Sequence, residues 1–249
     1  MKRMTAIFLA FLLAAALLTP ALGEETEDPL AWFRVSHGSR SEKKIAVTVD
    51  DCFDLAFTWK IRDLLQEQGV VATFFPIGVM IKPEDKSEWQ KILDNGNEIG
   101  SHNIGHYNMG NKDAWSIIRS LGMFQETLDS VLGYHYQVHC FRPPYGKTSD
   151  DKNRPATFTN AVNRFGYEHV ILWDVSQTNP KLAITSVQNG SILLYHARMQ
   201  DYNCLQELIP QLLDQGYELV TVSELLGFGE NEISPEPYVY NRADYEDPV

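Results

Sequence analysis

The sequence predicts an α/β fold, a single distorted (β/α) barrel with about seven parallel strands. Two observations support this prediction. Short β-rich runs alternate with helical segments from residue 43 to about residue 228, which is typical of strands joined by crossover helices. No internal repeat and no Gly/Ser linker divides this stretch, which indicates one domain. The main alternative is a doubly wound open sheet, which shows the same alternation.

Seven runs rich in β-branched and aromatic residues are the predicted strands. In chain order they span residues 44–49, 70–78, 97–102, 138–144, 168–175, 191–196 and 217–223. Amphipathic patterns between them predict helices that end at or just before a glycine, among them residues 57–69, 84–96 and 113–132.

The N-terminal region differs from this domain in composition. Lys2 and Arg3 precede an apolar run and then a small-residue pattern, which predicts a signal peptide over residues 1–23 and a secreted or extracytoplasmic, envelope-associated protein. An uncleaved anchor is the alternative, although the run is shorter than the roughly 18 apolar residues of a membrane span. No stable span is therefore expected after cleavage. Residues 24–42 are predicted to lead into the domain at 43–229.

The C-terminal residues 230–249 are acidic and show no periodicity. We expect them to form a solvated tail. The alternative is an extension that packs on the domain through Tyr238 and Tyr240.

Charge and cysteine content limit the partners and the covalent structure. The net charge of −12, which becomes more negative after loss of the signal peptide, argues against nucleic acid as a partner. Cys52, Cys140 and Cys204 are an odd number of thiols, so one bridge with a free thiol and three free thiols are both open. The sequence leaves the oligomeric state open.

Polar side chains gather where the predicted strands end. They are Asp50 and Asp51, Ser101 and His102, Arg142, Asp174, and His196. Because the carboxyl ends of the strands of an α/β barrel share one face, we expect these side chains to converge on one site.

The spacing of two histidines predicts a metal site. His102 and His106 stand four residues apart and can ligate one ion from one face of a helical turn. With one aspartate they form a set that leaves positions open for water and substrate, as in catalytic rather than structural sites. Since neighbouring residues of a strand point in opposite directions, one of Asp50 and Asp51 can bind the metal while the other acts as general base.

Five motifs, in the order "VDDCFD", "SHNIGH", "FRPPYG", "WDVSQTN" and "ILLYHA", resemble the polysaccharide deacetylase family, the NodB-homology carbohydrate esterases of family 4. The resemblance covers about residues 43–228. It implies removal of N-acetyl groups from amino sugars of an acetylated peptidoglycan or chitin-like glycan, with zinc as the usual divalent metal. An O-acetyl esterase of the same fold, a catalytically weakened glycan-binding module and an amidohydrolase of small amides are the alternatives.

The resemblance also implies individual roles. Asp50 stands at the position of the general base, and the metal positions are Asp51, His102 and His106. Arg142 would orient the base, the backbone N–H of Tyr145 would stabilise the oxyanion, and His196 would be the general acid.

Several residues are expected to bind substrate. The positions implied by the resemblance are Pro144, Tyr145, Trp173 and Leu194, with Leu194 lining a pocket for the acetyl methyl. Tyr107, Tyr145, Trp173 and Tyr195 could also stack on sugar faces, with core packing as the alternative.

Three departures from the family pattern affect the predicted site. Cys52 replaces a glycine and is interpreted as a fourth ligand, a regulatory thiol or a small buried residue. Asn103 replaces a serine or threonine, which changes loop hydrogen bonding. Asn179 replaces an aspartate that tunes the acid, so His196 lacks a charged partner unless Asp174 substitutes.

Overall fold

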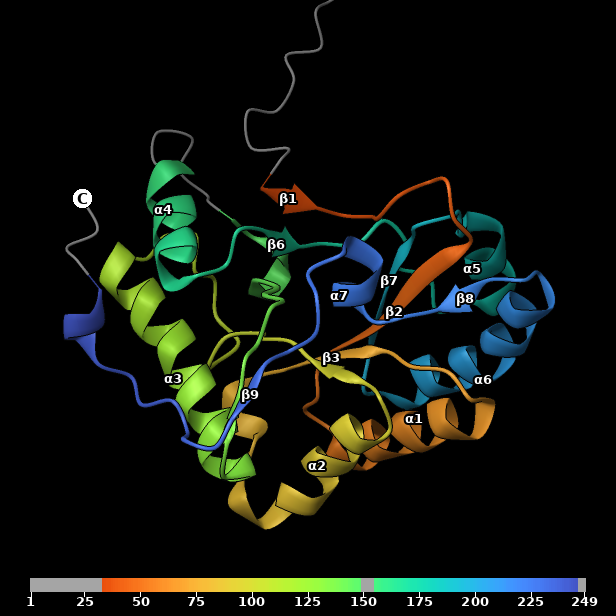
Figure 1. Ribbon diagram of the computed structural model, residues 1–249. Helices are drawn as coiled ribbons and strands as arrows, with labels where there is room; N and C mark the ends of the chain where they lie inside the picture. The colour runs from red at the N-terminus through yellow and green to blue at the C-terminus, as the bar shows by residue number, and fades with distance from the viewer. Residues whose placement is uncertain (1–32, 149–154, 246–249) are drawn as a thin grey trace, which may run out of the picture.

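The computed structural model describes residues 33–148 and 155–245 (Figure 1). The predicted signal peptide lies outside these residues. Within them, no helix combines the length and the apolar character needed to cross a membrane.

The centre of the domain is the long strand β2 (Lys44–Asp51), which is buried from Ile45 to its end. It pairs in parallel with three strands: β3 (Thr73–Pro76), β7 (Ile192–His196) and β8 (Glu218–Leu219). β3 pairs in turn with β4 (Glu98–Ile99). The continuous apolar run of β2 is explained by this position, because a central parallel strand is covered on both faces.

The remaining pairings are short and continue around the domain. Ser101 and Phe141 form a parallel bridge beyond β4, and the N–H of Ile171 in β6 (Val170–Ile171) donates to the carbonyl of Phe141 at 2.8 Å. β6 pairs with β1 (Arg34–Val35), and His37 bridges to Ser191 just before β7. The α/β class with parallel strands is therefore confirmed, with a ring of pairings that is interrupted at several places.

Two predicted strands are largely wrong. Residues 138–144 contribute a single bridge at Phe141, because Pro143 and Pro144 have no N–H to donate to a ladder. The last predicted strand stops at Leu219, since the Thr221 hydroxyl accepts the N–H of Glu224 and starts helix α7 (Val222–Leu226).

Helices surround the strands on the outside. Figure 1 shows α1 and α2 below the sheet, α5 and α6 on the right and α3 and α4 on the left. Their bounds are α1 Leu55–Gln68, α2 Lys86–Asp94, α3 Ala114–Leu132, α4 Pro155–Phe165, α5 Pro180–Ser186 and α6 Met199–Asp214. The described ranges also contain the short 3₁₀ helices η1 Gly78–Met80, η2 Pro83–Asp85, η3 Pro144–Gly146 and η4 Arg242–Asp244. The predicted helices at α1, α2 and α3 are confirmed, and Gly69 and Gly133 end two of them in left-handed conformations.

The C-terminal segment packs on the domain. β9 (Ile233–Ser234) pairs with β5 (His135–Tyr136), and the Tyr238 N–H donates to Asp129 Oδ2 at 2.8 Å. The ring of Tyr240 lies so close to α3 that a Cβ at Gly122 would be 2.2 Å from it. The expectation of a solvated tail is wrong for residues 230–245, because their aromatic side chains bury apolar surface against α3.

Candidate active site

Most of the predicted polar residues meet at the carboxyl end of the sheet. In the parallel register, Asp50 lies opposite His196, and Asp51 opposite Pro76. His102 and Arg142 follow the Ser101–Phe141 bridge, so both enter from the neighbouring side. This convergence follows from the parallel arrangement of the strands.

Asp51, His102 and His106 converge on one point. Asp51 Oδ1 lies 3.3 Å from His102 Nε2 and 3.4 Å from His106 Nε2, and the potential ligand atoms of the three residues all lie within 4.8 Å of one another. Asp51 Oδ1 is buried and has no hydrogen-bond partner among the described residues. One carboxylate oxygen and two imidazole nitrogens form a donor set that fits a divalent cation and leaves further coordination positions open.

Neighbouring groups hold these side chains in the form that binds metal. His102 Nδ1 is hydrogen-bonded at 2.8 Å to the carbonyl oxygen of Arg142, so Nδ1 carries the proton and Nε2 faces Asp51 with its lone pair. Burial lowers the pKa of His106 against the opposing effect of Asp51, which favours the neutral ring. Burial alone would raise the pKa of Asp51, but His102, His106 and His196 outweigh it and lower that pKa.

Asp50 is held by a buried arginine. Arg142 is fully buried and donates to Asp50 Oδ1 at 2.6 Å and to Thr48 Oγ1 at 2.7 Å. Its other nitrogens donate to the carbonyl oxygens of Ile171 and Leu172 at 3.1 and 3.0 Å. This guanidinium has no freedom to rotate, and its charge offsets the repulsion between the two adjacent carboxylates.

The backbone around this site is strained. Four non-glycine residues of the described chain have positive φ, and all four lie in the motif loops: Asp51 (66°), Cys52 (55°), Asn103 (72°) and Tyr145 (62°). Such conformations cost roughly 1–3 kcal/mol each and persist where the surrounding structure enforces them. At Asp51 the turn directs the carboxylate out of the strand and toward the histidines.

Comparison with known proteins identifies the family of the chain. The family model described as polysaccharide deacetylase matches residues 37–170. The chain belongs to the polysaccharide deacetylase family. It is 31% identical over 207 residues to a peptidoglycan-N-acetylglucosamine deacetylase of Bacillus cereus, covering 76% of this chain and 90% of that relative.

Two solved structures place the deacetylase among the family 4 carbohydrate esterases. A family 4 acetyl xylan esterase from Clostridium thermocellum, in complex with cobalt, is 26% identical with a TM-score of 0.63, covering 74% of this chain and 91% of the other. A mutant of a family 4 pseudoenzyme with restored activity is 25% identical with a TM-score of 0.68, covering 79% and 72%. The deacetylase is thus an amide hydrolase with an α/β fold of parallel strands.

The predicted acid of the deacetylase, His196, is held less firmly than the base. Its side chain is 30% exposed, and Nε2 lies 4.0 Å from Asp51 Oδ2. Its backbone N–H donates to Asp201 Oδ1 at 3.1 Å. The carboxylate of Asp201 is almost fully buried, and its Oδ2 has no hydrogen-bond partner in the described chain.

Asp174 does not replace the missing aspartate of the fourth motif. Its carboxylate accepts hydrogen bonds from Arg40 (2.8 Å), the Ser191 hydroxyl (3.0 Å) and the Ile192 N–H (2.9 Å). Ile192 begins β7 and His196 ends it, so the two groups lie at opposite ends of the strand. The expected convergence of Asp174 on the site is wrong. Asn179 caps α5 through the N–H groups of Lys181 and Leu182.

Cys52 behaves as a small core residue. Its side chain is fully buried in the main hydrophobic cluster, and burial raises the pKa of its thiol. It is not among the three groups that converge on the metal position. Cys52, Cys140 and Cys204 are all free thiols.

The predicted substrate-binding residues have different environments. Tyr145 is 61% exposed and its ring lies 4.4 Å from the His106 ring, while Trp173 flanks Arg142 at 5.7 Å. Pro144 and Leu194 are buried. Tyr195 is fully buried, so its alternative as a core residue is correct.

Three neighbours of the site were missed. Phe53 is 52% exposed with its ring edge-on to His106 at 5.8 Å, and Arg198 Nη2 lies 3.8 Å from Asp51 Oδ2. The third neighbour is Asp201, whose Oδ1 accepts a hydrogen bond from the backbone N–H of His196. Phe53 and Arg198 stand within two residues of predicted site residues, which was the only available signal.

Proposed function

We propose that the chain is an exported, metal-dependent deacetylase that removes N-acetyl groups from amino sugars of envelope peptidoglycan, with zinc as the preferred cation. The observation that carries the proposal is the convergence of Asp51, His102 and His106 beside the Asp50–Arg142 pair. The peptidoglycan deacetylase of Bacillus cereus supports the substrate class. The predicted signal peptide over residues 1–23 supports export.

In the proposed mechanism each residue has one task. A divalent cation bound by Asp51, His102 and His106 would polarise the acetyl carbonyl and acidify water. Asp50, held by Arg142, takes a proton as the water oxygen bonds to the carbonyl carbon. The backbone N–H of Tyr145 donates to the developing oxyanion. His196 then protonates the amine nitrogen as the C–N bond breaks, which releases acetate and a free amino sugar.

O-deacetylation is a second candidate, favoured by one observation. No side-chain carboxylate in the described chain is hydrogen-bonded to the His196 ring, whose Nε2 lies 4.0 Å from Asp51 Oδ2, so no carboxylate fixes the orientation of the ring. An alcohol leaving group depends less on a strong acid than an amine does. The acetyl xylan esterase among the structural relatives is consistent with this alternative.

The test is acetate release by the metal-loaded protein. The substrates are N-acetylglucosamine oligomers, peptidoglycan and acetylated xylan, each with and without chelator. We expect chelator-sensitive release from the first two. Release from xylan alone would establish the esterase, and glycan binding without any release would establish a weakened binding module.

Two variants assign the roles. Asp50→Asn should bind metal but lose most turnover, and His102→Ala should lose both. The exposed His37→Ala is the matched control and should lose neither. Full activity in Asp50→Asn would remove Asp50 as the base.

A further inference from the structure

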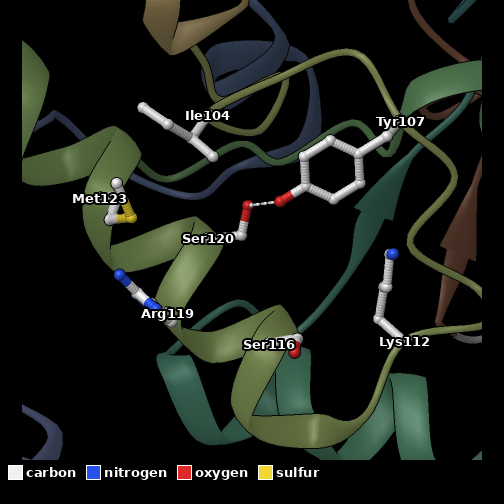
Figure 2. A pocket seen from close by; sticks show the side chains of 7 residues that line it. All are labelled: Ile104, Tyr107, Lys112, Ser116, Arg119, Ser120 and Met123. Carbon is white, nitrogen blue, oxygen red and sulfur yellow. Dashed lines mark hydrogen bonds between the residues drawn. The ribbon is translucent and has the colours of Figure 1, made fainter.

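A separate hollow of about 290 Å³ lies between the loop that follows His102 and helix α3 (Figure 2). None of the roles proposed above uses it. The residues that matter for its chemistry are Ile104, Tyr107, Lys112, Arg119, Ser120 and Met123.

The hollow is joined to the metal-site loop by sequence and by hydrogen bonds. Tyr107 directly follows His106, so their Cα atoms are about 3.8 Å apart. The Tyr107 hydroxyl lies 2.5 Å from Ser120 Oγ, and Figure 2 draws this hydrogen bond as a dashed line. The buried Ser120 hydroxyl donates to Asn103 Oδ1. Asn103 adjoins His102 and donates to the carbonyl of Gly105. A group bound in the hollow would therefore lie one residue of chain away from a proposed metal ligand.

The charge of the hollow is opposite to that of the protein. Lys112 and Arg119 are exposed at its edge, and neither forms an ion pair within the described residues. Lys112 Nζ lies 5.6 Å from the centre of the Tyr107 ring. In a chain with a net charge of −12, two unpaired cations on one hollow create a local site for an anion. Figure 2 shows Ile104 and Met123 across the hollow from Lys112, which adds an apolar wall.

We propose that this hollow is a subsite for a carboxylate-bearing sugar adjacent to the acetylated residue, and that it selects acidic over neutral glycan. The inference rests on the proposed function, since peptidoglycan contains N-acetylmuramic acid, whose lactyl ether carries both a carboxylate and a methyl group. The carboxylate is attracted by the positive charges of Lys112 and Arg119, which lie on opposite sides of the hollow, and the methyl packs on Ile104 and Met123. A carboxylate of the stem peptide has the same chemistry and is the other source.

The test is the double variant Lys112→Gln/Arg119→Gln in the full, metal-loaded chain. Lys60→Gln is the matched control, because Lys60 is also exposed and also lies over an aromatic ring, that of Phe57 at 4.8 Å. Four substrates are compared: peptide-free peptidoglycan oligosaccharides, the same oligosaccharides with the lactyl carboxyl amidated, peptide-bearing fragments with that carboxyl blocked, and N-acetylglucosamine oligomers.

We expect the double variant to raise KM about five- to tenfold for the peptide-free acidic oligosaccharides, with kcat unchanged. Amidated and neutral substrates should show no change, and Lys60→Gln should match wild type throughout. A KM increase confined to peptide-bearing fragments would assign the subsite to the stem peptide. An equal effect on neutral oligomers, or none on any substrate, would overturn the subsite.

A binding measurement separates this inference from the proposed function. Calorimetric titration of Asp50→Asn, with and without the double substitution, uses the acidic oligosaccharide and its amide as ligands. Weaker binding of the acid alone supports the subsite even if wild type releases no acetate. Equal binding of acid and amide to both proteins overturns it even if acetate is released.

Discussion

The surroundings of Asp50, the proposed base, differ from those of His196, the proposed acid. Asp50 is buried and bonded to a fully buried Arg142 that makes three further hydrogen bonds. His196 is 30% exposed, and only its backbone is hydrogen-bonded to a nearby carboxylate. The proposed base is therefore held in place by the fold, whereas the proposed acid has room to move with the substrate.

The largest expected effect on stability comes from removing the ion pair between Arg142 and Asp50. Arg142→Ala should reduce the free energy of unfolding by about 3–5 kcal/mol, because it leaves the Asp50 carboxylate buried without its cation. Denaturant unfolding of the metal-free protein measures it. A decrease in the free energy of unfolding below about 1 kcal/mol would mean that Arg142 does not stabilise the buried Asp50 carboxylate.

Substitution of His196, the proposed acid, should lower kcat and leave the fold intact. His196→Gln should lower kcat by roughly 10²-fold or more, since it removes the proton donor but no buried charge partner. Its melting temperature and metal affinity should equal those of wild type. A kcat within a few-fold of wild type would exclude His196 as the acid.

The buried carboxylate of Asp201, beside His196, should make the stability of the protein depend on pH. Burial raises the pKa of Asp201 above its usual 3.8, so the folded state holds this proton more tightly than the unfolded state does. Its stabilising contribution is complete below about pH 3.8 and is lost as pH rises through the raised pKa. Asp201→Asn should therefore be more stable than wild type by about 1 kcal/mol at pH 7, and the gain should vanish at acidic pH. Thermal unfolding across that range measures it, and a constant difference would contradict the assignment.

The smallest effect is expected at Cys52, which lies two residues after Asp50, the proposed base. Cys52→Gly relieves the positive φ of 55° but loses a buried side chain, so stability should change by less than about 1 kcal/mol. Metal affinity and acetate release should be retained. Loss of metal binding would show that the thiol acts as a ligand.

The sequence anticipated the site better than it anticipated the strands. Two-residue strands such as β4 and β6 are too short to show a periodicity of their own. The sequence offered the packing of the C-terminal segment through Tyr238 and Tyr240 only as the alternative to a solvated tail. The contacts of this segment, such as Tyr240 against Gly122, join residues more than a hundred positions apart in the chain.

By itself, the sequence determined the α/β class and predicted the residues that converge at the proposed metal and base positions. Alternating periodicity and short motifs are local properties that a single chain displays. Only the tertiary structure decided that Asp174 turns away from His196 and that Asp201 lies beside it. It also placed two cations that form no ion pair within the described residues, Lys112 and Arg119, at the hollow next to the loop of the proposed metal ligands. These outcomes depend on which strand ends and helix faces meet in space, and no local pattern encodes such long-range contacts.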